Sequence, residues 1–164
     1  MARWVVARVW FIQDFVPCAG ALEALKMLHQ SGYLLLAFTN HPDIARGLVT
    51  KEEFTKQLLA YGFGDVFLCP HQPTDGCRCR KPSTYMLDLA VESYGLGRHA
   101  CYVVGDRWTD MLAGTNAGIN VILVTTECWQ EALEQYADHW DTGKAAHVSP
   151  SLADAAAWIV SQKG

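Results

Sequence analysis

The sequence predicts an α/β fold, in which helices flank a parallel β-sheet. Short apolar runs of strand length alternate along the chain with segments of helical periodicity, which is the pattern of successive βαβ units. The runs are apolar throughout, as is typical of parallel strands that are buried on both faces. Hydrophobic residues make up 51% of the 164 residues and charged residues 18%, which suits a globular core of this size. We therefore expect one domain that spans 1–164.

The individual elements follow from apolar runs, helical spacing and end signals. Residues 3–12 (RWVVARVWFI) and 33–38 (YLLLAF) are strand-like runs, and leucines at helical spacing lead up to Gly32 between them. Thr50 and Glu53 form the pattern of a capping box, in which each side chain bonds the backbone N–H of the other residue. In chain order, the sequence predicts strand 3–12, helix 20–32, strand 33–38, helix 50–64, strand 66–69, helix 83–95, strand 101–106, helix 107–118, strand 119–126, helix 128–137, a short strand near 146–149 and helix 151–161.

Charge and hydropathy exclude several classes of protein. The formal net charge of -4 argues against a nucleic-acid or anionic-membrane partner, because neither is attracted to an acidic protein. The same charge disfavours a zinc-dependent nucleic-acid module. No apolar stretch approaches the roughly 20 residues of a membrane-spanning helix. The N-terminal apolar run contains an internal arginine and lacks a small-residue cleavage site, so we expect no signal peptide.

Polar residues follow three of the predicted strands. In open α/β sheets, ligands bind outside the carboxyl ends of the strands, so these residues should meet in one crevice. Taken singly, each is better explained as a turn residue, a helix cap or a surface charge. The combination of a hydroxyl, an amide, basic groups and two carboxylates favours a binding site. The residues concerned are Thr39, Asn40, Arg80, Lys81, Asp106 and Asp110.

This set of groups suits phosphoryl transfer. Carboxylate oxygens are the hard ligands that Mg2+ prefers, which points to Asp106 and Asp110. A lysine charge and a hydroxyl can bind phosphoryl oxygens, which points to Lys81 and Thr39. A helix N-terminus after Thr39 or Gly105 would offer free N–H groups to an anion.

The loop LCPHQPTDGCRCRKP (68–82) carries the most specific local signal. Its spacing C-x-H-x5-C-x-C supplies thiolates and an imidazole, the ligands of tetrahedral Zn2+. Four protein ligands leave no open position on the ion, so we expect a structural zinc that stiffens the loop. A metal site built from thiolates suits a reducing compartment, and we expect a cytoplasmic protein. The expected ligands are Cys69, His71, Cys77 and Cys79, whereas Cys18, Cys101 and Cys128 are expected to be ordinary buried thiols.

Three segments together resemble the haloacid dehalogenase (HAD) superfamily: FTNHPDIARG (38–47), CPHQPTDGCRCRKP (69–82) and VVGDRWTDMLAGTNAG (103–118). Within it, they are similar to the zinc-containing branch of heptose bisphosphate phosphatases and histidinol-phosphate phosphatases. The similarity covers about residues 16–126, and HVSPSLADAAAWI (147–159) is also similar. It implies a Rossmann-like sheet with a small or absent cap. It also implies a Mg2+-dependent phosphatase that works through an aspartyl-phosphate.

The resemblance also implies a role for each matching residue. Thr39 takes the place of the phosphate-binding residue of the second motif, with Asn40 beside it. Lys81 takes the place of the lysine of the third motif, and Arg80 is expected to contact the rest of the substrate. The remaining assignments are Asp106 as the metal ligand of the fourth motif, Asp110 as its second acidic residue and Arg46 as a substrate contact.

The chain departs from the family pattern in two places. His41 and Asp43 alter a substrate-facing loop, so the family's substrate does not carry over directly. The family's nucleophile lies in a D-x-D-G motif at the end of the first strand, and no such motif occurs here. By the family's usual spacing from Thr39, the motif would fall before the first residue. The one acidic residue upstream of the first helix is Asp14, and no acid lies two residues beyond it.

Three explanations of the missing motif remain open. The chain is a late-starting version of an active phosphatase, a divergent form in which Asp14 is the nucleophile, or a non-catalytic relative. Because the first strand is central in this fold, we expect 3–12 to fill its place and to bring Asp14 near its carboxyl end. The sequence thus predicts a HAD-type, Mg2+-dependent phosphatase domain for a small phosphorylated metabolite, such as a sugar phosphate. The alternative is an inactive domain that binds a phosphorylated ligand or a protein in the same crevice.

Overall fold

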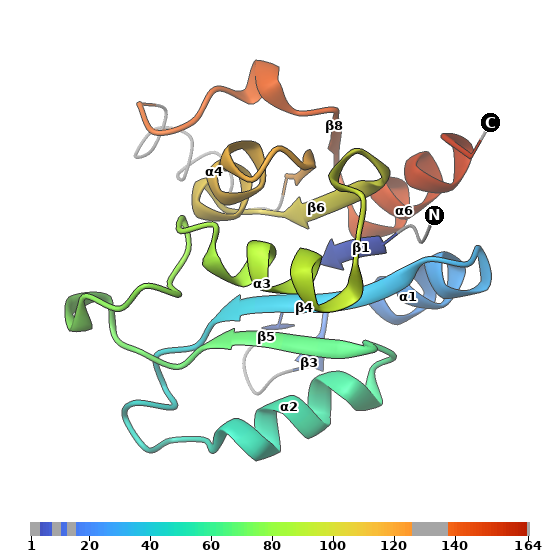
Figure 1. Cartoon of the computed structure of the whole chain (residues 1–164). Helices are drawn as coiled ribbons and strands as arrows, with labels where there is room; N and C mark the ends of the chain where they lie inside the picture. The colour runs from blue at the N-terminus through green and yellow to red at the C-terminus, as the bar shows by residue number, and fades with distance from the viewer. Residues whose placement is uncertain (1–3, 8–10, 13–15, 126–137, 164) are drawn as a thin grey trace.

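A computed structural model of the chain describes residues 4–7, 11–12, 16–125 and 138–163. A six-stranded sheet forms its middle layer, in the order β5-β4-β1-β6-β7-β8, and every neighbouring pair is parallel (Figure 1). The predicted α/β class with a parallel sheet is therefore confirmed. The strands are β1 Trp4–Ala7, β4 Leu34–Asn40, β5 Asp65–Cys69, β6 Cys101–Gly105, β7 Asn120–Val124 and β8 His147–Ser149.

The central strand β1 is shorter than the sequence predicts. It pairs with β4 on one side and β6 on the other, so the N-terminal run does fill the central place. It ends at Ala7, however, and the prediction of one strand over 3–12 is wrong. Phe11–Ile12 (β2) instead pairs antiparallel with Val16–Pro17 (β3) in a separate two-stranded sheet. An apolar, β-branched run predicts strand conformation but does not show where the chain leaves one sheet for another.

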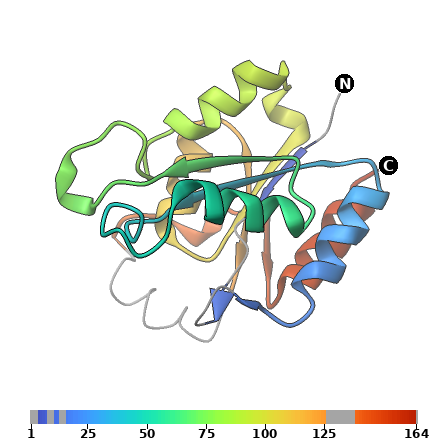
Figure 2. The same ribbon diagram turned by 90° about the horizontal axis from the view of Figure 1, so that it is seen from below.

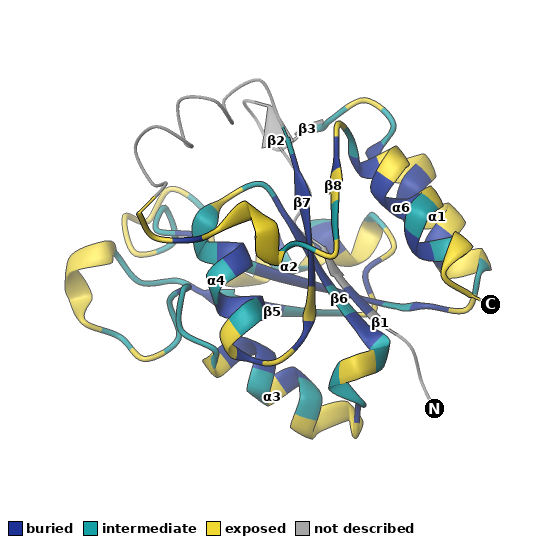
Figure 3. Ribbon diagram, turned by 90° about the horizontal axis from the view of Figure 1, so that it is seen from above, coloured by how far each residue is buried: buried dark blue, intermediate teal, exposed yellow. Residues whose placement is uncertain are grey.

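Side chains alternate between two cores along each buried strand, because successive residues of a strand point to opposite faces. On β4, Leu35 and Ala37 belong to one cluster, whereas Leu36 and Phe38 belong to the other. The first cluster packs against α1, α2 and α6, and the second packs against α3 and α4. Figure 2 shows the helices on either side of the sheet, and Figure 3 shows the buried stripes of the helices. Both faces of the sheet are therefore covered, which explains why the strands are continuously apolar.

The helices begin and end close to the positions that the sequence predicts. Thr50 accepts a hydrogen bond from the backbone of Glu53 and Glu53 accepts one from Thr50, which confirms the capping box. Gly95 ends the third long helix in the left-handed conformation that favours glycine. The predicted helix at 128–137 lies outside the described residues. The helices are α1 Ala21–Gln30, α2 Lys51–Ala60, α3 Tyr85–Tyr94, α4 Trp108–Asn116 and α6 Leu152–Ser161, with short 3-10 turns η2 Pro73–Asp75, η3 Arg98–Ala100 and η4 Thr142–Lys144.

Two features of the sheet position the site. Its carboxyl edge brings together the ends of β4, β5, β1 and β6, because parallel strands end on the same side. In addition, β4 runs through Asn40, so Thr39 and Asn40 are its last residues and pair with Leu68 and Cys69 of β5. Across the part of the chain that the structure describes, none of the helices has both the length and the apolar character needed to cross a bilayer.

Gly114 is where α4 lies closest to the sheet, and its replacement tests this packing. A Cβ added there would come within 2.4 Å of Val121 Cγ1 and 3.1 Å of Val103 Cβ, and both valines are buried. Gly114→Ala should lower the free energy of unfolding by about 1–3 kcal/mol, because overpacking outweighs the roughly 1 kcal/mol that alanine adds in helix propensity. Urea denaturation would measure this.

The matched control is Asn116→Ala, an exposed site on the same helix, which should stay within about 0.5 kcal/mol of the parent. Equal stability of the Gly114 variant and the parent would contradict close packing of α4 on β6 and β7.

Candidate active site and metal centre

Lys81 lies buried at the carboxyl edge of the sheet, in contact with a buried carboxylate. Its Nζ donates to Asp110 Oδ1 at 2.5 Å and to the carbonyl oxygen of Phe38 at 3.3 Å. The side chains of Lys81 and Asp110 are 2% and 0% exposed, so little water solvates either charge. The ammonium also lies 4.3 Å from the centroid of the Phe38 ring. The third-motif lysine and the fourth-motif acid assigned from sequence are thus brought together.

A glycine makes room for Asp110 beneath β6. A Cβ at Gly105 would lie 2.5 Å from Asp110 Cβ and 2.6 Å from its Oδ2, so any larger residue would displace the carboxylate. Asp110 also accepts a hydrogen bond from the backbone N–H of Arg107 at 3.2 Å, which ties it to the start of α4. The resemblance assigned Asp110 to Mg2+. In the structure, Oδ1 of Asp110 accepts from Lys81 and Oδ2 accepts from this backbone N–H, and the Mg2+ assignment stays a prediction.

Asn40 bonds to the backbone of Lys81 through both ends of its amide. Its Oδ1 accepts from Lys81 N at 3.0 Å, and its Nδ2 donates to Lys81 O at 3.4 Å. Thr39, the neighbouring residue at the end of β4, is half-buried on the same edge of the sheet. Asn40 therefore bonds to the segment that carries Lys81, and its expected contact with phosphate or substrate stays a prediction.

Asp106 comes directly after β6 and is half-buried at the same edge. Burial and, to a lesser degree, the nearby Asp106 carboxylate raise the pKa of the Cys18 thiol. Cys18, expected to be an ordinary buried thiol, is therefore half-buried within the electrostatic reach of the expected metal ligand. This proximity is not predictable from the sequence, because Cys18 stands 88 positions before Asp106 and lies in no recognisable motif.

The remaining predicted residues lie further out or beyond the description. Arg80 donates to the carbonyl of His71 at 3.4 Å, so it lies against the Cys/His loop. Arg46 lies in the exposed turn after β4 and forms an ion pair with Asp43 at 3.0 Å. Asp14 lies outside the described residues. It follows β1 by seven positions and falls between β2 and β3, which pair with each other apart from the main sheet.

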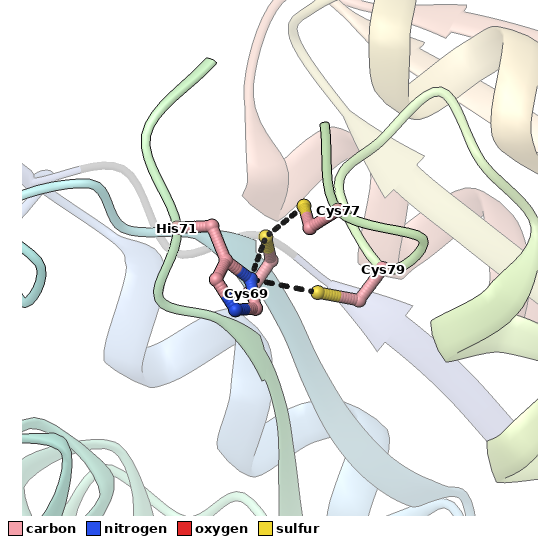
Figure 4. Close-up of side chains that lie close together, drawn as sticks. All are labelled: Cys69, His71, Cys77 and Cys79. Atoms are coloured by element: carbon pink, nitrogen blue, oxygen red, sulfur yellow. Dashed lines mark hydrogen bonds between the residues drawn. The ribbon is translucent and has the colours of Figure 1, made fainter. Parts of the chain in front are cut away.

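Three cysteines and a histidine converge in the loop that follows β5, as Figure 4 shows. Cys69 Sγ lies 3.6 Å from His71 Nδ1 and 3.6 Å from Cys77 Sγ, and Cys79 Sγ lies 3.2 Å from His71 Nδ1. A tetrahedral zinc ion, about 2.3 Å from sulfur and about 2.0 Å from nitrogen, requires S–S separations of about 3.8 Å and S–N separations of about 3.5 Å. The cluster therefore fits a four-coordinate metal ion.

The surroundings shift the pKa values of two cluster thiols in opposite directions. Burial raises the pKa of Cys69 to about 12, a value at which the thiol keeps its proton when no metal is bound. Burial also acts to raise the pKa of Cys77, but hydrogen bonds from the backbone of Arg80 and from neighbouring thiols lower it below the usual value. A metal ion would stabilise both thiolates, as it does at thiolate sites in general.

The buried ion pair predicts that replacing Asp110 lowers the free energy of unfolding much more than replacing Asp88 does. Asp110→Asn should lower the free energy of unfolding by about 3 kcal/mol or more, because it leaves the Lys81 charge buried without a counter-charge. Asp88→Asn is the matched control, since Asp88 pairs with Arg98 at 2.8 Å but both side chains are a third or more exposed. Solvent screens that pair, so its loss should cost about 1 kcal/mol or less. Similar effects of the two variants on urea denaturation would contradict a buried, desolvated pair.

Comparisons with known proteins agree with this geometry. A family model described as HAD-hydrolase-like matches residues 78–155. The chain is 33% identical over 133 residues to D-glycero-beta-D-manno-heptose-1,7-bisphosphate 7-phosphatase of Pseudomonas putida, covering 76% of each chain. It is 35% identical over 132 residues to the enzyme of the same name from Pasteurella multocida, covering 70% of this chain and 71% of the relative.

Solved structures show the same similarity over the whole length. The D,D-heptose 1,7-bisphosphate phosphatase of B. bronchiseptica, solved with magnesium and phosphate, superposes with a TM-score of 0.81 at 26% identity and covers 99% of both chains. The corresponding enzyme of Burkholderia thailandensis shares the fold, with a TM-score of 0.70 at 24% identity over 98% of this chain and 99% of its own. The chain therefore belongs to the HAD superfamily, in the branch that contains the heptose bisphosphate phosphatases.

Proposed function

We propose that this chain is a HAD-type phosphatase domain that holds a small phosphorylated sugar at the carboxyl edge of its sheet. One observation carries the proposal: a lysine cation is fixed at that edge by a buried carboxylate, in a chain similar to enzymes named for heptose bisphosphate. Lys81 offers a localised positive charge to phosphoryl oxygens, and Thr39 offers a hydroxyl from the adjacent strand end. We further propose that residues 1–164 form one domain.

Two metal ions belong to the proposal. Mg2+ would be held by Asp106, whose carboxylate follows β6 at the same edge, and it would neutralise charge on the phosphoryl group. Zn2+ would be held by Cys69, His71, Cys77 and Cys79 and would have a structural role, because four protein ligands complete its coordination. A thiolate metal site suits a reducing compartment such as the cytoplasm.

The end of β1 favours a second candidate function, ligand binding with little turnover. The family resemblance puts the nucleophile at the end of the first strand, and here that strand ends at Ala7. Ala7 and the three residues that follow it, Arg8, Val9 and Trp10, include no carboxylate. Lysine and metal can hold a phosphate without a nucleophile, but they cannot replace the attacking atom.

The metal proposal predicts about one equivalent of zinc per chain in protein purified without added metal. Cys77→Ser should lose most of this zinc and unfold at lower urea concentration, because folding is coupled to metal binding. Cys101→Ser is the control: Cys101 is also buried near the sheet but donates to Gly97 O and is not part of the cluster, so its zinc content should not change. Elemental analysis decides the question, and a parent protein with less than about a tenth of an equivalent would contradict a zinc site.

The catalytic proposal predicts binding of phosphate with slow turnover. With Mg2+ present, inorganic phosphate should bind with heat measurable by titration calorimetry. Hydrolysis of D-glycero-beta-D-manno-heptose 1,7-bisphosphate should stay well below about 1 per second. The double variant Ala7→Asp/Val9→Asp introduces two acids in D-x-D spacing, starting at the last residue of β1, and should raise the rate about a hundredfold or more.

Asp14→Asn serves as the control, because it should leave the low rate unchanged. Turnover of about 1 per second or more in the unaltered chain, abolished by Asp14→Asn, would show that Asp14 is the nucleophile. That result would overturn the proposal of weak turnover but would leave the phosphatase assignment intact.

A further inference from the structure

Both stems of the Cys/His loop are attached to the last residue of β4 and to the residue that follows it. At the start of the loop, Cys69 pairs with Asn40 across the β4–β5 ladder, and its carbonyl accepts from His41 N at 2.8 Å. At the end of the loop, the peptide groups of Lys81 bond to the Asn40 side chain at 3.0 and 3.4 Å. Residues 40 and 41 therefore hold the entrance and the exit of a loop that spans 69–81.

The exit of the loop is also where the phosphate-binding group is placed. Cys79, the last cluster residue, stands two positions before Lys81, which leaves little chain between the cluster and the lysine backbone. The Lys81 side chain is fixed separately, by Asp110 and by Phe38 O. Its ammonium position thus depends on two anchors, the carboxylate beneath it and the Asn40 amide beside its backbone.

We infer that Asn40 is a positioning residue that couples occupancy of the Cys/His cluster to ligand binding at Lys81. This inference rests on the proposed function, because it takes phosphate as the ligand of Lys81. When metal is bound to the cluster, it fixes the end of the loop. The hydrogen bonds of Asn40 then hold that end against β4, so that Lys81 is in position before phosphate binds. Binding to a site already held in place avoids the free-energy cost of ordering it.

Coupling between two sites is reciprocal. If metal in the cluster strengthens phosphate binding by some factor, phosphate must strengthen metal binding by the same factor. Phosphate should therefore slow the release of zinc from the unaltered protein. A residue with only a general structural role would change stability without making zinc release respond to phosphate.

The test compares the parent protein with Asn40→Ala, Asn40→Asp and the exposed control Asn116→Ala. Zinc release to an excess of a chromogenic chelator is followed with and without inorganic phosphate and Mg2+, and phosphate affinity is measured by calorimetry. Asn40→Ala should weaken phosphate binding about tenfold and should make zinc release insensitive to phosphate. Asn40→Asp keeps the acceptor for Lys81 N–H. It should therefore retain part of the phosphate affinity and part of the phosphate dependence of zinc release. Asn116→Ala should behave as the parent does.

The outcomes separate this inference from the proposed function. Unchanged phosphate affinity in Asn40→Ala, or zinc release that still slows with phosphate in that variant, would overturn the coupling while leaving phosphate binding intact. A parent protein that binds no phosphate would overturn the proposed function. In that case the phosphate-free arm still tests the loop attachment, because Asn40→Ala should release zinc several-fold faster than Asn116→Ala, and equal rates would refute it.

Discussion

The ion pair between Lys81 and Asp110 is the interaction on which the arrangement of the site depends. Two opposite charges at 2.5 Å, both almost completely buried, stabilise the fold only while both are present, because either charge alone would be left without water or a partner. The pair links the loop after β5 to the start of α4, two segments that come together only when β1 lies between β4 and β6. Gly105 is required at the same point, since a side chain there would displace the carboxylate.

In the loop after β5, the Cys/His cluster offers an ordering contact that apolar packing does not provide. Most of residues 70–80 are polar, proline or glycine, and of the four cluster residues only Cys69 is fully buried. A segment of this composition does not order itself by burial, so bonds to the proposed metal ion would take the place of a hydrophobic core locally. Because Cys79 lies two positions before Lys81, a fixed cluster would also restrict the position of the Lys81 backbone. The carboxyl edge of the sheet at Lys81 and the Cys/His cluster are therefore adjacent parts of one structural unit.

The sequence predicts the main features of this unit. The features that it does not predict depend on contacts between residues that lie far apart in the chain. The ends of a helix are predicted correctly where a local signal marks them, as the Thr50 and Glu53 capping box does for the start of α2. The Cys/His cluster is also predictable, because its ligands lie within one loop and their chemistry is specific. The end of β1 at Ala7 is not predictable, since the apolar run continues although the hydrogen-bonding partners change. The bond of Asn40 to the Lys81 backbone is equally hidden, because it joins residues 41 positions apart through groups that no motif records.

The placement of β1 also governs how the fold can assemble during synthesis. In chain order, β1 precedes the other strands of the main sheet. Its two neighbours in that sheet are β4 and β6, and β6 ends at Gly105. Until about two thirds of the chain has emerged from the ribosome, β1 therefore has at least one unpaired edge, with apolar side chains beside it. Such an edge is a template for pairing with another nascent chain. Folding yield should therefore depend on the delay between synthesis of β1 and β6, and codon choice or chaperone binding over residues 8–105 would change it without altering the final structure.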